Sequence, residues 1–83
     1  MNKAQEKIAE RKATEEIYTL VFDKLSYQQD QLNGYAEELA EADILRLGFA
    51  PGRNREFLET AIQNAKARVN AYERICKTLL EML

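Results

Sequence analysis

The stretch LGFAPGRN, Leu47–Asn54, holds two of the three glycines and the only proline of this 83-residue chain. Gly48 suits the end of a helix, because glycine readily adopts the left-handed conformation found there. Pro51 cannot continue that helix, since it lacks an amide hydrogen. Asn54 suits the start of a second helix, because its side chain can accept a hydrogen bond from a free N–H of the first turn. The stretch therefore predicts a turn between two helices.

The sequence on both sides of this turn has the periodicity of amphipathic helices. Apolar and aromatic residues recur at spacings of three and four, which places them on one helix face. Before the turn these positions are Tyr18, Val21, Leu25, Leu32, Tyr35, Leu39 and Ala42, with the polar Gln28 among them. After the turn they are Leu58, Ile62, Ala65, Val69, Tyr72, Cys76, Leu79 and Leu83. No stretch alternates with period two for long enough to form a strand, so the pattern predicts an all-α protein.

The two stripes also fit each other when the chain is folded back at the turn. Residues whose numbers add up to about 101 then lie opposite each other, as in an antiparallel coiled coil. This alignment pairs Leu39 with Ile62, Leu32 with Val69, Leu25 with Cys76, Tyr18 with Leu83 and Tyr35 with Ala65. We therefore predict one domain, a long antiparallel helical hairpin. Its segments are a charged helical arm over 1–16, a first long helix over 17–47, a turn over 48–53 and a second long helix over 54–83.

Gly34 lies in the middle of the predicted first helix. An Asn-Gly pair usually indicates a turn. The heptad phase nevertheless continues across it, from Leu32 to Leu39. This continuity favours one long helix in which Gly34 costs about 1 kcal/mol relative to alanine. A break at Gly34, which would give three helices, is the alternative.

The composition predicts self-association. A chain this short buries a modest fraction of its surface, and the single cysteine, Cys76, allows no intrachain disulfide. Many apolar residues fall outside the predicted seam, where they would be exposed in a single hairpin. They are Ile17, Leu20, Phe22, Ile44, Leu45, Leu47, Phe49, Phe57, Ile75, Leu80 and Met82. We predict a homo-oligomer, at least a dimer that forms a four-helix bundle.

The sequence argues against several functional classes. The chain has no histidine, the commonest general base and metal ligand, and it has no P-loop or nucleophile–base pair. We expect no enzymatic activity, no cofactor and no bound metal. The longest apolar run, YTLVF, is too short to cross a membrane, and the charged N-terminus is unlike a secretory signal. We therefore expect a cytoplasmic protein without membrane association.

Basic residues gather in the second half of the chain. Residues 53–83 hold six basic and four acidic side chains, whereas residues 1–52 hold six basic and ten acidic ones. Arginines near a helix N-terminus can hold a phosphate or a carboxylate. The candidate ligand-binding residues in this cluster are Arg53, Arg55, Thr60, Gln63 and Lys66. The alternative is an ordinary solvated surface.

The stretch GRNREFLETAIQNAKARVNAY, residues 52–72, resembles the second helix of a small helical-hairpin family in phages. Members of that family counter the CBASS and Thoeris defences by sequestering cyclic nucleotide signals. Their pattern of arginine, threonine, an aliphatic residue and glutamine is matched by Arg53, Thr60, Ile62 and Gln63. In the first helix, Lys24 beside Leu25 resembles the family's aliphatic–lysine pair, but no glycine follows closely. The resemblance implies an oligomeric cyclic-nucleotide sponge and adds Lys24 to the candidate site.

Three functions are therefore open. The first is a non-enzymatic binding protein, a phage anti-defence protein that sequesters cyclic nucleotides. The second is an interaction module or inhibitor that binds a host protein through its apolar face. A DNA-associated regulator is third, because the turn is longer than that of a helix-turn-helix motif and Ile44 occupies the position of an expected small residue. We expect no nucleic-acid partner for the first two.

Overall fold

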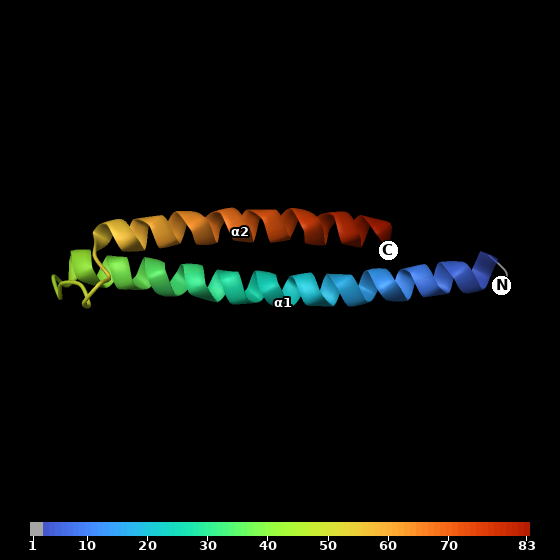
Figure 1. The fold of residues 1–83 in the computed structure, drawn as a ribbon, viewed down its shortest axis with the longest axis horizontal. Helices are drawn as coiled ribbons and strands as arrows, with labels where there is room; N and C mark the ends of the chain where they lie inside the picture. The colour runs from blue at the N-terminus through green and yellow to red at the C-terminus, as the bar shows by residue number, and fades with distance from the viewer. Residues whose placement is uncertain (1–2) are drawn as a thin grey trace.

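The computed structural model describes residues 3–83 as two antiparallel α-helices joined by one loop (Figure 1). The first helix, α1, spans Lys3–Ile44, and the second, α2, spans Arg55–Met82. Together they form a rod of 65 × 18 × 15 Å. The predicted all-α hairpin is confirmed. Residues 1 and 2 of the predicted arm lie outside the described residues.

Helix α1 runs unbroken through Gly34. The prediction of one long helix is confirmed, and the three-helix alternative is wrong. The half-buried residues Leu32, Tyr35 and Leu39 lie against α2 on both sides of the glycine. Their packing outweighs the cost of about 1 kcal/mol that glycine brings to a helix interior. A Cβ added at Gly34 would meet no atom within 4 Å, so no contact inside the chain requires a glycine there.

The predicted stripes do form the contact between the helices. All eight positions of the α1 stripe are half-buried, and the α2 stripe contains the whole core of the described chain. This core consists of Leu58, Ala65, Val69, Cys76 and Leu79. None of residues 3–44 is fully buried. The exception to the prediction is Leu83, which is exposed at the end of α2.

The alignment of the two helices differs from the prediction. The carbonyl of Leu83, predicted opposite Tyr18, instead accepts a hydrogen bond from Arg11 at 3.3 Å. The ring of Tyr35 lies edge-on to that of Phe57, with centroids 6.4 Å apart. Helix α2 therefore lies further toward the N-terminus of α1 than predicted. The part of α1 before Arg11 extends beyond the end of α2 as an arm (Figure 1).

The loop explains this difference in alignment. Helix α1 ends at Ile44 rather than at the predicted Leu47, and the loop covers residues 45–54. The left-handed residue that follows the helix is Arg46, with φ 55°, rather than Gly48. Gly48 takes its positive φ of 78° inside the loop. The early end leaves Asp43 beside the start of α2, where it pairs with Arg55.

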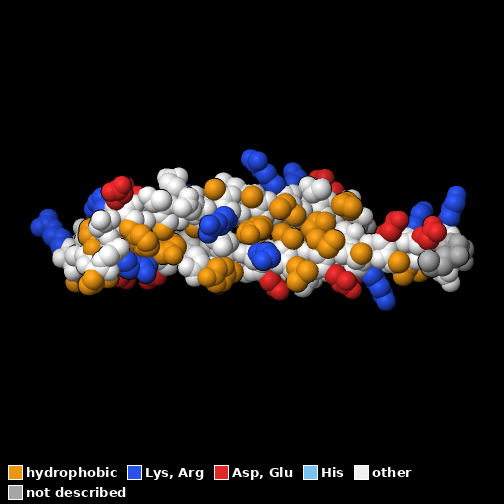
Figure 2. Space-filling view, in the orientation of Figure 1, with side chains coloured by type: hydrophobic (Ala, Val, Ile, Leu, Met, Phe, Trp, Pro, Cys, Tyr) orange, Lys and Arg blue, Asp and Glu red, His pale blue; other side chains and the backbone are white. Residues whose placement is uncertain are grey.

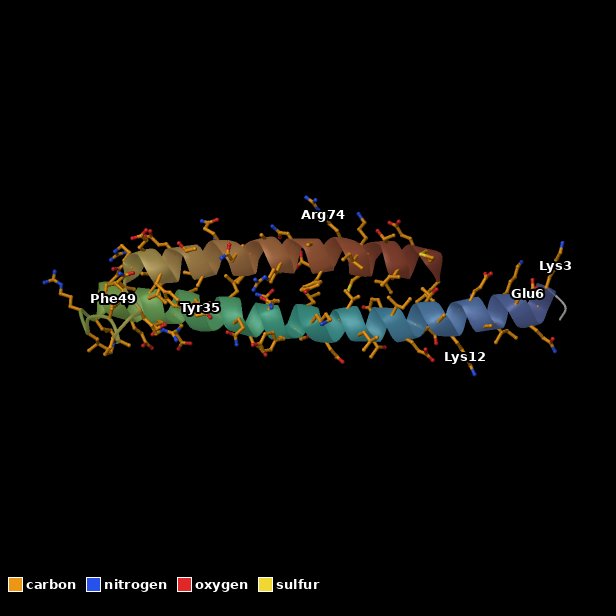
Figure 3. All side chains as sticks on the ribbon, in the orientation of Figure 1. Lys3, Glu6, Lys12, Tyr35, Phe49 and Arg74 are labelled. Carbon is orange, nitrogen blue, oxygen red and sulfur yellow. The ribbon has the colours of Figure 1, made fainter. Side chains whose placement is uncertain are left out.

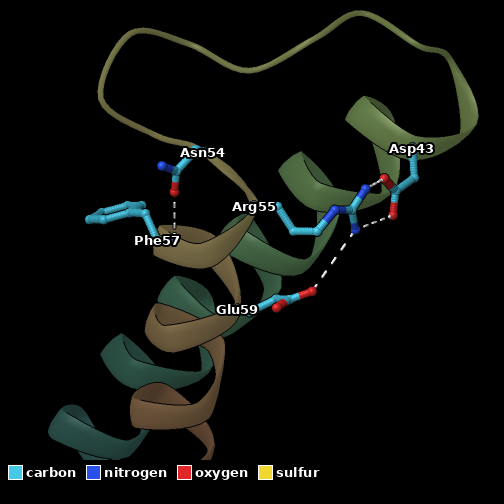
Figure 4. Close-up of polar contacts among 5 residues, drawn as sticks. All are labelled: Asp43, Asn54, Arg55, Phe57 and Glu59. Atoms are coloured by element: carbon cyan, nitrogen blue, oxygen red, sulfur yellow. Dashed lines mark hydrogen bonds and ion pairs between the residues drawn. The ribbon is translucent and has the colours of Figure 1, made fainter.

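Asn54 caps α2 as predicted. Its backbone is extended, and its side-chain Oδ1 accepts a hydrogen bond from the backbone N–H of Phe57 at 2.9 Å (Figure 4). This bond satisfies one of the amide groups that have no partner within the first turn of a helix. The second helix therefore begins where the sequence predicts it.

Candidate binding surfaces

The six predicted site residues do not converge on one site. Arg53 and Arg55 lie at the loop end of the hairpin, in ion pairs with α1. Thr60, Gln63 and Lys66 line grooves between the helices further along α2. Lys24 is exposed on α1 and lines none of the grooves described below. Ligand binding by these residues stays a prediction.

Arg53 is held by a carboxylate of α1. Its Nη2 and Nε atoms donate hydrogen bonds to Oε2 of Glu38 at 2.7 and 3.1 Å. The guanidinium also lies over the rings of Tyr35 and Phe57, 5.4 and 5.5 Å from their centroids. Charge-assisted bonds and cation–π contacts of this kind reinforce each other. Arg53 thus fastens the loop to α1, and a phosphate bound there would have to displace Glu38.

Arg55 is held in the same way at the opposite flank of the loop. Its guanidinium pairs with both carboxylate oxygens of Asp43 and lies 4.0 Å from a carboxylate oxygen of Glu59 (Figure 4). It also lies over the ring of Phe49. These contacts connect the first residue of α2 to the last turn of α1. The two arginines that the sequence analysis assigned to anion binding therefore pair with carboxylates of the same chain, at the closed end of the hairpin.

A first groove, groove A, runs between the helices on one face of the hairpin and has a volume of about 590 Å³. Tyr27, Gln31 and Tyr35 line it from α1, and Phe57, Asn64 and Arg68 line it from α2. Aromatic rings can stack on a planar group, amides can bond its polar edge, and the arginine can hold an anion. The sequence analysis placed Tyr27 and Arg68 on helices but did not bring them together. Only the alignment of the helices does so.

A second groove, groove B, opens on the opposite face. Its lining includes Ala36 and Ala40, which lie on the flank of α1 opposite Tyr27 and Gln31. Gln63 and Lys66 line it from α2, and Thr60 borders both grooves. Groove B is therefore where three of the predicted site residues lie together. Its volume is about 840 Å³.

Groove A continues into an apolar face toward the open end of the hairpin. Leu20 lies seven residues before Tyr27, and Ile75 lies seven residues after Arg68, so each stays on the flank that lines the groove. The same spacing adds Met82. We call this surface the apolar face; it consists of Ile17, Leu20, Tyr27, Phe57, Ile75 and Met82, which are 43–66% exposed. Figure 2 shows apolar side chains of both helices gathered in a band along one face of the rod.

The exposed surface away from the helix contact carries charged side chains as well as further apolar ones, such as Phe22 and Leu80. Lys12 and Arg74 point away from the space between the helices, whereas Tyr35 lies within it (Figure 3). On the groove B side, the flank of α2 carries Glu59 and Lys66. Every apolar residue that the sequence analysis placed outside the seam is exposed, so this part of the prediction is confirmed.

No family model, curated protein or solved structure matched this chain in comparisons with known proteins. Within residues 3–83, neither helix combines the length and the apolar content needed to cross a membrane. In the same residues, no three potential metal-ligating side chains form a group.

Proposed function

We propose that the protein is a non-enzymatic binding protein that acts by stoichiometric association, with the apolar face as its binding surface. The observation that supports this proposal is the contrast between a core of five buried residues and the six large exposed side chains of the apolar face. A large exposed apolar patch on a protein usually marks a site at which another molecule binds. The proposal makes the protein an interaction module, and it extends the second function above from a host protein to any partner that covers this face.

The energetics agree with this assignment. Covering a Leu, Ile or Met side chain contributes about 1.5–3 kcal/mol when it is fully buried. Leu20 and Met82 are 62% and 66% exposed, so much of that contribution is still available to a partner. The flank of groove B offers less, because it carries fewer large exposed apolar side chains, chiefly Phe22 and Leu80.

The test compares matched substitutions on the two faces. Leu20→Asp and Ile75→Asp place charges in the apolar face. Phe22→Asp and Leu80→Asp are their controls, since these apolar residues are similarly exposed and keep the heptad spacing of groove B. The readout is the size of the complex that contains the tagged chain in extract of its source cells. We expect the first pair to reduce it to the monomer and the controls to leave it unchanged. A wild-type chain that runs as a monomer in that extract would contradict the proposal.

A second candidate, sequestration of a cyclic nucleotide, is favoured by the lining of groove A. Three rings, Tyr27, Tyr35 and Phe57, lie there with amide side chains and Arg68. Rings of this kind stack on bases, and arginine binds phosphate. In this proposal the protein is a counter-defence sponge, as the resemblance to the phage family implies.

Thermal unfolding with cyclic dinucleotides and cyclic ADP-ribose isomers tests the second candidate. A ligand at 100 times its Kd adds about 2.7 kcal/mol to the stability of the folded state. We expect Arg68→Gln to remove the resulting shift in Tm and the outward-pointing Arg74→Gln to retain it. If no compound shifts the Tm of the wild-type chain, the candidate is wrong.

A further inference from the structure

The surface area of the hairpin is too large for a compact protein of its mass. A monomeric protein of 9.6 kDa exposes about 5,100 Å² by the usual scaling of area with mass, whereas this chain exposes 6542 Å². The excess is about 1,400 Å². A standard interface covers about 800 Å² on each partner, and obligate dimers cover more. The exposed area therefore matches what a permanent partner would bury.

Both helices carry a second heptad stripe outside the seam. Its contact with the other helix is at Phe57, whose ring lies edge-on to that of Tyr35. On α1 it runs through Ile17, Leu20, Lys24, Tyr27, Gln31 and Gly34, and on α2 through Phe57, Ala61, Asn64, Arg68, Ile75 and Met82. Spacings of three, four and seven, as found here, are typical of bundles in which each helix packs against two others. The apolar face thus has the pattern of a helix-packing surface along its length.

Gly34 is the one member of this pattern that lacks a side chain. Glycine destabilises a helix interior relative to alanine. Apart from its chain neighbours and the adjacent backbone of α1, no atom of the described residues comes within 4 Å of the position of its missing Cβ. A glycine on a helix surface does, however, allow another backbone to approach closely. The separation of two packed helices depends on the side chains at their contact, so the closest approach falls where these are smallest.

We propose that a second copy of this chain covers the apolar face and that one of its helices crosses α1 at Gly34. This inference rests on the proposed function and names the partner. A second copy has the same length and the same two stripes, so it can cover the face along the whole rod. It is also present wherever the chain is made, as required if a hairpin with a five-residue core depends on association for its stability.

The substitution Gly34→Ala gives opposite results with and without a crossing helix. In a solvent-exposed helix, alanine in place of glycine raises the Tm by about 4–8 °C for a chain of this size. At a crossing point, the added methyl group separates the helices. We then expect sedimentation equilibrium of the purified chain to show a dimer whose Kd rises at least tenfold in the variant, with no gain in Tm. Ser26→Ala, an exposed change on the groove B flank, is the control and should leave the Kd unchanged.

The outcomes separate this inference from the proposed function. A purified wild-type chain that is monomeric at micromolar concentration, with Gly34→Ala raising its Tm, overturns the second copy as the partner. The proposed function then still stands if Leu20→Asp reduces the size of the complex in extract. A dimer whose Kd is the same with alanine at position 34 overturns the crossing at Gly34. A dimer that Leu20→Asp fails to dissociate places the interface elsewhere and overturns the inference as a whole.

Discussion

The two helices of the hairpin have different surroundings although each packs on the other. Helix α2 contains all five buried residues of the described chain, whereas none of residues 3–44 in α1 is fully buried. The apolar residues of α2 are concentrated on the side that faces α1, while those of α1 are spread over several flanks. A helix that is apolar on several sides is stable in water only when several neighbours cover it. Helix α1 thus carries apolar residues beyond those that α2 covers.

The two ends of the hairpin differ as well. At the loop end, Asn54 caps α2, and Arg53 and Arg55 tie its start to carboxylates of α1. At the open end, a hydrogen bond from Arg11 to the carbonyl of Leu83 joins the helices. Helix ends without caps or packing open most easily. We therefore expect the loop end to hold the alignment of the hairpin.

The largest expected effect is the loss of stability when a seam residue is truncated, which should be greater on α2 than on α1. Leu58 is 0% exposed on α2, so Leu58→Ala should cost about 2–5 kcal/mol of unfolding free energy. Leu32, half-buried in the α1 seam, should lose about half as much on the same change. Urea unfolding of both variants at one fixed protein concentration measures the difference. Equal losses would show that α1 is as well covered as α2.

Removing the cap should have the next largest effect. Asn54→Ala leaves the N–H of Phe57 without its partner and should cost about 1 kcal/mol. Asn54→Asp keeps an acceptor at the same place and should retain the stability of the wild-type chain. Thermal unfolding followed by circular dichroism compares the two variants. If the Asn54→Ala and Asn54→Asp variants have the same Tm, the cap does not contribute to stability.

These same residues show which features of the fold can be predicted from the sequence. Heptad spacing depends on side-chain type alone, so it correctly predicted the seam positions from Tyr18 to Leu79. Asn54 was predictable because a cap is a local interaction. The alignment was not predictable from spacing, since the stripes fit each other at several offsets and the loop selects one. Asp43 and Arg55 pair at the closed end of that alignment, and their pairing has no pattern in the sequence.

The candidate site shows the same limit. The sequence analysis correctly placed the arginines at the turn, but it could not tell that Glu38 and Asp43 would occupy them. Groove A was missed for a related reason. Its rings and amides come from both helices and meet only once the alignment is known. The spacing of Tyr27, Gln31 and Tyr35 at four-residue intervals was the available signal.

The ion pair at the loop end should have a smaller effect than the cap. Arg53 and Glu38 are 41% and 33% exposed, so solvent weakens their attraction. A double-mutant cycle with Arg53→Ala and Glu38→Ala should give a coupling free energy of about 0.5–1 kcal/mol, and added salt should reduce it. The same cycle with Arg74→Ala in place of Arg53→Ala is the control. A coupling of zero would leave the loop end held by Asn54 and the Arg55 pair.

The smallest expected effect concerns the end of α1, where the chain uses an arginine in a conformation that favours glycine. A left-handed residue other than glycine costs about 1–2 kcal/mol, and glycine returns part of this through its greater freedom in the unfolded chain. Arg46→Gly should therefore stabilise the protein by about 0.5 kcal/mol, seen as a small rise in Tm. Gly48→Ala is the matched change in the opposite direction and should lower the Tm, because alanine would have to adopt a φ of 78°. If both changes lower the Tm, the side chain of Arg46 makes a stabilising contact at the end of α1. The end of α1 and the start of α2 would then both be held by side-chain contacts.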